Sequence, residues 1–249
     1  MTKFIIIALV ILAAVALVAC VSSNNVLNEI KTYDIASDIR SLNIEVNAAD
    51  FTIEQGDEFL VESNLIYLTV SDNGGVLKIK DETKISLGYA NAVLKLYVPA
   101  GTVFEDAKIN TGAGRLTAEK INAKTLELKT GAGKVEFASI EATEKIDIKG
   151  GAGSIEIKDG TLNNLNLDLG VGNLDMTAEL RGENNLKFGV GHSGLTLKGD
   201  RDDYRFDVET GIGKVSIDGR DAFSFANSGN GENSVKIKGG VGATDINFK

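Results

Sequence analysis

Apolar and polar residues alternate along most of the chain, and a recurring Gly-x-Gly interrupts the alternation. A period of two is typical of β-strands with one buried face. In most copies, the positions five and three before the first glycine are apolar, as are the positions four and six after it. In one copy these are Leu126 and Leu128, then Val135 and Phe137. Each copy therefore predicts two strands joined at a Gly-x-Gly corner.

The corner occurs seven times, with steps of 19, 20, 19, 19, 22 and 29 residues between first glycines. The glycine pairs are Gly112 and Gly114, Gly131 and Gly133, Gly151 and Gly153, Gly170 and Gly172, Gly189 and Gly191, Gly211 and Gly213, and Gly240 and Gly242. One unit cannot bury its own apolar row, so neighbouring units must stack at about 4.8 Å per rung. The repeat predicts an all-β, single-chain β-solenoid (a β-helix-like stack) with about 19–20 residues per coil.

The residue between the two glycines is always Ala, Val or Ile. We predict that this side chain points inward, and that the flanking glycines meet a need for positive φ or close backbone approach. The predicted buried column consists of Ala113, Ala132, Ala152, Val171, Val190, Ile212 and Val241.

Residues 26–110 precede the clear repeats and are expected to form an N-terminal β region that starts and caps the stack. Residues 42–53 reproduce the repeat spacing with Asn47 and Ala49 in place of the glycines, which predicts a degenerate first coil. Further strands are expected at 76–80 and 92–98, where Pro99 removes a ladder donor. Residues 111–249 hold the repeats, which are expected to follow one another in sequence order.

The 29-residue step before the last corner contains about ten extra residues, among them Phe223 and Phe225. We expect this excursion to fold over the last coils.

Residues 1–19 have the order of a secretory signal, in which Lys3 precedes an apolar run from Phe4 to Ala19. Leu17-Val18-Ala19-Cys20 resembles the bacterial lipobox, and this resemblance implies acylation of Cys20, the only cysteine. Residues 20–25 would then be a short polar tether. An uncleaved membrane span over residues 4–21 and an ordinary cleaved signal are the alternatives. All three place the rest of the chain outside the cytoplasm.

The charge balance restricts the partners. The 26 basic and 35 acidic side chains give a net charge of −9, the wrong sign for nucleic acid. An acidic body also repels anionic lipids, so membrane association is assigned to the acyl chains. One Cys and one His are too few for a usual Cys/His zinc site. No cofactor or metal is expected.

Two motifs suggest chemistry that their context disfavours. Residues 189–194 match the dinucleotide fingerprint G-x-G-x-x-G, but an alternating strand follows where a helix is needed. His192 and Ser193 are adjacent, but no orienting acid or oxyanion hole is evident for a nucleophilic pair. We expect a local bulge at this point and no catalytic residue.

Calcium is disfavoured on similar grounds. Residues 150–155 and 239–244 resemble the opening of the calcium-binding nonapeptide repeat, with Ile155 and Thr244 in place of its ligating Asp. The cluster of Asp200, Asp202 and Asp203 offers oxygen ligands, but arginines interrupt it, which favours a solvated loop.

The sequence lacks the features that are usual in glycosidases and sugar-binding proteins. Acidic residues of the repeats alternate outward with lysines, as Glu127 does with Lys129, whereas a glycosidase needs a paired, partly buried set. The chain has no Trp, and its five Tyr are off the repeat period, which disfavours sugar binding. Tyr67, Tyr89 and Tyr97 are expected either to complete the N-terminal core or to form a contact cluster. Because some β-helices are polysaccharide lyases or hydrolases, a carbohydrate-active enzyme is the enzymatic alternative.

The chain carries a family resemblance in residues 94–101 (Leu-Lys-Leu-Tyr-Val-Pro-Ala-Gly), in the first corner at 109–114 and in the repeats that follow. Together they resemble the bacterial "putative adhesin" family, a β-strand-repeat domain of unknown function on envelope proteins. The resemblance covers about residues 40–249 and implies a solenoid at the cell envelope with no established catalytic residues. Some relatives are encoded with envelope-stress systems.

Our hypothesis is a lipid-anchored, extracytoplasmic, non-catalytic interaction or structural module with a protein partner. The alternative function is that of an accessory protein in an envelope-stress sensing system.

Overall fold

The computed structural model describes residues 27, 29–36, 38–83, 91–221 and 230–249. This part of the chain is all-β, with fifteen strands in one sheet and one 3-10 turn, η1 (Arg201–Asp203). The sheet does not close on itself. The all-β prediction is therefore confirmed. The predicted signal peptide 1–19, Cys20, the tether 20–25, Tyr89, Phe223 and Phe225 lie outside the described residues.

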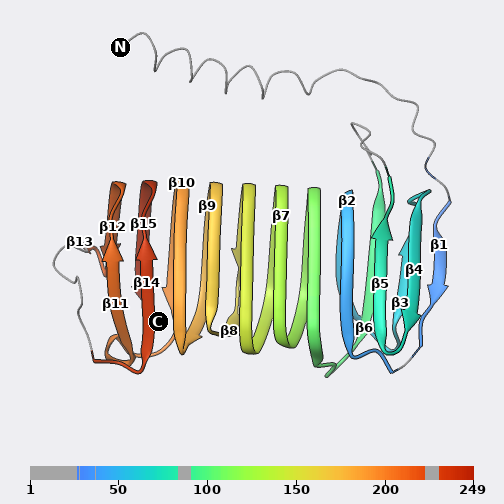
Figure 1. Cartoon of the computed structure of the whole chain (residues 1–249), viewed down its shortest axis with the longest axis horizontal. Helices are drawn as coiled ribbons and strands as arrows, with labels where there is room; N and C mark the ends of the chain where they lie inside the picture. The colour runs from blue at the N-terminus through green and yellow to red at the C-terminus, as the bar shows by residue number, and fades with distance from the viewer. Residues whose placement is uncertain (1–26, 28, 37, 84–90, 222–229) are drawn as a thin grey trace, which may run out of the picture.

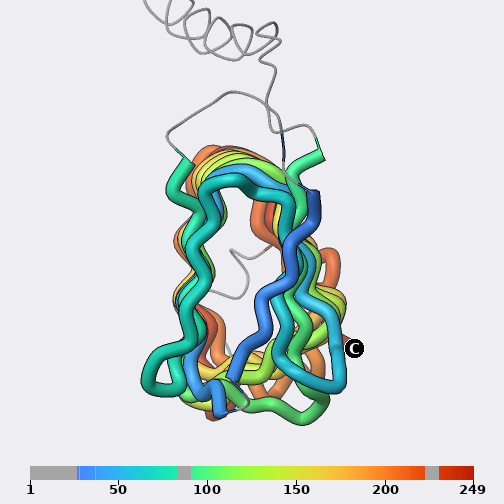
Figure 2. Tube along the Cα trace, turned by 90° about the vertical axis from the view of Figure 1, so that its right-hand side faces the viewer, coloured from blue at the N-terminus to red at the C-terminus, as the bar shows by residue number. Residues whose placement is uncertain are grey.

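Several strands run through the corners without interruption, so that the chain rises, turns and descends in a series of parallel arches (Figure 1). Figure 2, which looks along the stack, shows the arches superimposed as a flattened ring. The strands are β1 (Lys31–Asp34), β2 (Ser41–Gly56), β3 (Leu60–Ser63), β4 (Leu68–Asn73), β5 (Val76–Asp81), β6 (Val93–Pro99), β7 (Phe104–Ile157), β8 (Gly160–Asn163), β9 (Leu165–Arg181), β10 (Glu183–Leu197), β11 (Tyr204–Glu209), β12 (Ile212–Ile217), β13 (Arg220–Asp221), β14 (Asn233–Lys238) and β15 (Val241–Phe248).

The core lies inside the flattened ring, and its side chains are those that the alternation predicts. Val135, Ile155 and Leu174 are buried, and Ile148 lies in register with buried Leu167 of the next coil. Equivalent residues of successive coils thus stack in columns. Each column buries aliphatic surface at about 25 cal/mol per Å², and this burial drives the stacking.

The coils do not follow one another in space as they do in sequence. At the N-terminal end, β2 pairs in parallel with β7 on one side, and with β5 and β6 on the other. The coil formed by β5 and β6 therefore lies outside the coil that precedes it in the chain. Antiparallel strands complete this end, since β4 pairs with β5, β3 with β6, and β1 with β3.

The same exchange occurs at the C-terminal end. β14 and β15 pair in parallel with β10, and β11 and β12 pair with β14 and β15 in turn. The last coil in sequence is thus inserted between the coil of β10 and the coil of β11 and β12 (Figure 1). The expectation of sequential stacking is wrong at both ends, because strand alternation specifies which face is buried but not which coil is the neighbour.

The predicted buried column between the glycines is also wrong. The side chains of Val171, Val190, Ile212 and Val241 are 58%, 49%, 82% and 48% exposed, and those of Ala113, Ala132 and Ala152 are exposed as well. The reason is the direction of the missing glycine side chains. A Cβ placed on Gly131 would lie 2.5 Å from the carbonyl oxygen of Gly112 in the neighbouring coil. Because the glycines face along the stack, the residue between them points away from the convex corner.

Backbone conformation adds a second requirement at the corner. The second glycine has a positive φ in six of the seven corners, between +117° and +157°. Such angles are costly for any residue with a Cβ. The two glycines thus allow close backbone stacking and a sharp bend.

Candidate functional site at the Gly-x-Gly ridge

The residues between the glycines form one continuous exposed line along an edge of the stack, here called the ridge. In spatial order the ridge consists of Ala113, Ala132, Ala152, Val171, Val190, Val241 and Ile212. Six steps of about 4.8 Å make it about 29 Å long. The side chains grow from Ala to Val to Ile toward the C-terminal end, where Ile212 is the most exposed. A continuous exposed apolar line is unusual on a soluble protein and suggests a contact surface.

Basic residues lie directly beside the ridge. The flanking rows are the positions two before the first glycine and three after it, and in the seven coils they hold seven basic residues against two acidic ones. The basic residues are Arg115, Lys129, Lys134, Lys149, Lys187, Lys214 and Lys238, and the acidic ones are Asp168 and Glu209. The ridge therefore has a local positive charge on an acidic protein.

The charge reverses two residues farther from the ridge. The distal rows, at positions four before and five after the first glycine, hold two basic residues against seven acidic ones. They are Lys108 and Lys236 against Glu127, Glu136, Asp147, Glu156, Asp175, Asp207 and Asp245. The acidic excess of the chain is thus displaced from the ridge toward the middle of the flat faces.

Several flanking lysines pair with carboxylates. Lys238 Nζ lies 3.0 Å from Glu209, and Lys134 Nζ lies 2.7 Å from Glu136. The hydrogen bond from Lys134 is the main cause that lowers the pKa of the Glu136 carboxyl. Exposed pairs of this kind stabilise a fold by no more than about 1 kcal/mol, so they leave the lysines available to other anions. Within the described ranges, no carboxylate lies at ion-pair distance from Arg115, Lys149 or Lys214.

The flat faces below the ridge carry polar ladders that cross from coil to coil. Asn185 Nδ2 donates to Asn166 Oδ1 at 3.2 Å, and Asn166 Nδ2 donates to Asp147 Oδ1 at 3.1 Å. Lys187 Nζ lies 3.3 Å from Asp168 in the same way. The ladder residues themselves line a groove, together with Lys149 and Lys238. These contacts hold outward side chains of one coil against those of the next, so this part of the flat face is an ordered polar surface.

The structure rules against the nucleophilic pair and the dinucleotide site that the sequence motifs suggested. His192 is exposed, whereas Ser193 is buried on the opposite side of β10, so they form no nucleophilic pair. The His192 Nδ1 atom lies 4.0 Å from Asp245 Oδ2. Strand β10 continues through Leu197, so no helix follows residues 189–194.

Among the residues that the structure describes, no group of three or more His, Cys, Asp or Glu side chains could hold a metal ion. Asp200 and Asp203 instead cap the turn η1, in which the Asp200 backbone N–H donates to Asp203 Oδ2 at 2.9 Å. The same part of the chain also contains no helix of a length and hydropathy suited to a membrane span.

The tyrosines of the N-terminal region differ in environment. Tyr97 is half-buried, and its hydroxyl donates to Glu62 Oε2 at 3.3 Å, while Tyr67 is 60% exposed. Desolvation is the main cause that raises the pKa of Tyr97. The Tyr97 contact joins β6 to β3 in the N-terminal cap.

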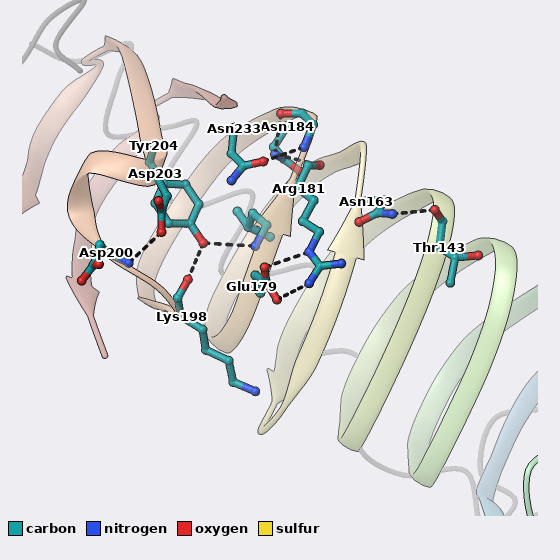
Figure 3. A network of polar contacts seen from close by, with 12 residues as sticks. Thr143, Asn163, Glu179, Arg181, Asn184, Lys198, Asp200, Asp203, Tyr204 and Asn233 are labelled. Atoms are coloured by element: carbon teal, nitrogen blue, oxygen red, sulfur yellow. Dashed lines mark hydrogen bonds and ion pairs between the residues drawn. The ribbon is translucent and has the colours of Figure 1, made fainter. Parts of the chain in front are cut away.

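A buried polar network that the alternation pattern did not reveal holds the inserted coil (Figure 3). Asn184 is 1% exposed, and its Oδ1 accepts the Leu165 N–H at 3.0 Å. Its Nδ2 donates to the carbonyls of Gly182 and Ser234 at 3.2 and 3.1 Å. Asn184 therefore joins the coils of β9, β10 and β14. The only available signal was an Asn at a position that alternation assigns to the core.

Tyr204 closes the same end of the core. Its hydroxyl donates to the Lys198 carbonyl at 2.6 Å and accepts the Leu180 N–H at 3.4 Å (Figure 3). Burial is the main cause that raises the pKa of the Tyr204 hydroxyl. The ring packs on Phe206 and Phe248. This aromatic cluster has a structural role, because it closes the core at the last coils.

Parallel coils stacked through Gly-x-Gly corners, with one exposed apolar edge, define the structural class of this protein. A family model described as Toastrack DUF4097 matches residues 39–247, so the chain belongs to this family of domains of unknown function. The resemblance found in the sequence is confirmed at this level. No curated protein matches the chain.

Solved structures give similar arrangements at low identity. A "putative adhesin" from Bacteroides fragilis is 12% identical with a TM-score of 0.48, over 88% of this chain and 96% of that one. A "putative adhesin" from Parabacteroides merdae is 11% identical with a TM-score of 0.41, over 91% and 98%. A "putative cell adhesion protein" from Clostridium sporogenes is 15% identical with a TM-score of 0.37, over 89% and 98%.

Proposed function

We propose that this protein is a lipid-anchored, extracytoplasmic β-solenoid that acts as a non-catalytic, adhesin-like interaction or structural module of the bacterial cell envelope. The lipobox-like Leu17-Val18-Ala19-Cys20 supports the anchor. The stacking of parallel coils in register supports the solenoid class.

The observation that carries the interaction role is the pair of flat faces, where outward side chains are tied from coil to coil. The Asn185–Asn166–Asp147 ladder and the Lys187–Asp168 pair are held before any partner arrives. Binding to such an ordered surface costs less side-chain entropy than binding to free side chains. A protein partner of mixed charge fits these faces better than an apolar one.

The anchor is tested by fractionating cells that express the wild type, Cys20→Ala or the control Ser22→Ala. The wild type and Ser22→Ala are expected to incorporate labelled palmitate and to remain with the membrane, whereas Cys20→Ala loses the label and enters the soluble extracytoplasmic fraction. An unlabelled wild type, or a Cys20→Ala variant that stays equally membrane-bound, would refute the lipid anchor.

The interaction role is tested by crosslinking in intact cells through a photoreactive residue at Asn185 on the flat face. A specific adduct that disappears when Asn166 and Asp147 are replaced by alanine supports a protein partner. An adduct with a sensor kinase would assign the protein to envelope-stress signalling instead of adhesion. No adduct at any flat-face position would contradict the interaction role.

A further inference from the structure

We propose that the ridge rests on the anionic lipid surface of the membrane in which the protein is anchored. The flat faces then stand upright from that surface. This inference rests on the proposed lipid anchor and adds to it the orientation of the folded domain. Three features of the structure support it: the exposed apolar line, the charge beside it, and the place where the chain enters the fold.

The apolar line is suited to shallow insertion. Val171, Val190 and Val241 are about half exposed and Ile212 is 82% exposed, all at the apex of their corners. The glycines on both sides have no side chains that would hold the apex away from a surface. Apolar side chains on the rim of a protein gain free energy on entering the boundary between headgroups and acyl chains. The corners stack in register and lie at a common level along the stack (Figure 1), so the rungs of the line can approach one plane.

The charge pattern selects an anionic surface. The flanking rows hold seven basic and two acidic residues, and the distal rows hold two basic and seven acidic ones. Lysine and arginine stems extend along apolar surface while their charged ends reach the headgroups. The acidic excess that would repel the membrane is about two residues, or roughly 7 Å, farther away, close to one Debye length at physiological salt.

The chain enters the folded domain at the same edge. Lys31 of β1 pairs with Ser63, Ser63 with Leu94, and Leu94 with Phe51. Phe51 in turn lies in register with Leu116, which follows the first Gly-x-Gly corner. Lys31 is therefore level with the start of the descending strands and close to the ridge side. Eleven residue steps separate Cys20 from Lys31 and span at most about 40 Å when extended, so an acylated Cys20 at the membrane leaves the ridge edge within reach of the lipid.

A second copy of the chain is the competing occupant of the ridge. Two ridges brought together would also bring their basic flanking rows together, and like charges across a contact oppose association. An anionic bilayer offers both an apolar layer and the opposite charge. The combination of an apolar line with basic flanks therefore favours lipid.

Because the chain has no Trp, single Trp probes give an unambiguous test. The full-length acylated protein is reconstituted into phosphatidylglycerol/phosphatidylcholine vesicles that contain brominated lipids. Val190→Trp and Ile212→Trp place the probe on the ridge, and Thr196→Trp places it six residues down β10 on the flat face. We expect a blue shift and loss of fluorescence for the two ridge probes and neither change for Thr196→Trp.

The charge contribution is tested by replacing Lys129, Lys149, Lys187 and Lys238 with Gln in the Val190→Trp background. The matched control replaces Lys108, Lys145, Lys158 and Lys236, which lie farther from the ridge. We expect the flanking set to lose quenching on anionic vesicles and the control set to keep it. Equal loss in both sets would overturn the assignment of an anionic surface to the ridge.

The outcomes separate the two proposals. If the protein floats with the vesicles but both ridge probes stay unquenched, the ridge inference is overturned and the anchor stands. If the protein does not float with the vesicles, the anchor is refuted, and the orientation that depends on it is refuted as well. If the ridge probes shift blue without lipid as protein concentration rises, the ridge is a contact between copies and the inference is overturned.

Discussion

Replacing Gly172 with Ala tests the physical reason for the corner glycines. Gly172 has φ +154°, and a Cβ there would overlap the carbonyl oxygen of Gly153 in the neighbouring coil. A residue other than Gly in this region of backbone space costs about 1–3 kcal/mol, and forcing an extra carbon into a packed site costs about another 1–3 kcal/mol. We therefore expect Gly172→Ala to lower the free energy of unfolding by about 2–6 kcal/mol.

Two controls divide this cost into its parts. Gly219 also has a positive φ, +72°, but a Cβ there would meet nothing within 4 Å, so Gly219→Ala keeps the conformational cost of about 1 kcal/mol without the overlap. Val171→Ala changes the exposed neighbour of Gly172 and is expected to stay within about 0.5 kcal/mol. Urea unfolding followed by far-ultraviolet circular dichroism measures all three variants. If Gly172→Ala unfolds at the same urea concentration as Gly219→Ala, the close approach of the coils is refuted.

Two further predictions concern the contacts around the inserted coil. Asn184→Ala removes the acceptor of the Leu165 N–H, whereas the Gly182 carbonyl still accepts the Ser234 N–H. The variant should cost about 1–3 kcal/mol in urea unfolding, whereas exposed Asn185→Ala should stay within about 0.5 kcal/mol; equal costs would contradict the network. Burial raises the pKa of the Tyr204 hydroxyl in the folded state. The contribution of the neutral hydroxyl to stability is therefore complete below the unfolded pKa of about 10, and it is lost as pH rises through the folded pKa. Tyr204→Phe should therefore show a smaller decrease in stability than the wild type between pH 9 and about 11, and an unchanged slope would refute the assignment.

The predictions from sequence succeeded where the controlling physics is local. Alternation at Leu126 and Leu128, and again at Val135 and Phe137, identified buried positions that the structure confirms. The family resemblance rested on the same repeated spacing and is confirmed as well. The segment with Asn47 and Ala49 stacks on the first Gly-x-Gly corner, with Ala48 beside Ala113.

The predictions failed where the answer depends on the neighbouring coil. The residue between the glycines was assigned to the core because it is apolar, yet the glycine Cβ directions are filled by the backbone of the next coil, as at Gly131 and Gly112. The exchange of coil order at the two ends was also missed. Since all coils share one alternation pattern, each offers nearly the same edge to every other, and specific contacts such as those of Asn184 decide between them.

The amino-acid sequence by itself determined the strand alternation, the places where the chain turns, and the charge carried by each outward row, because these depend on side-chain chemistry and on spacing along one strand. Only the tertiary structure decided which coils are neighbours and which way the corner side chains point. Both depend on the backbone of a coil distant in the sequence, and the free energy of stacking is defined only after that coil is in place. The ridge, with its basic flanks, is a product of that stacking.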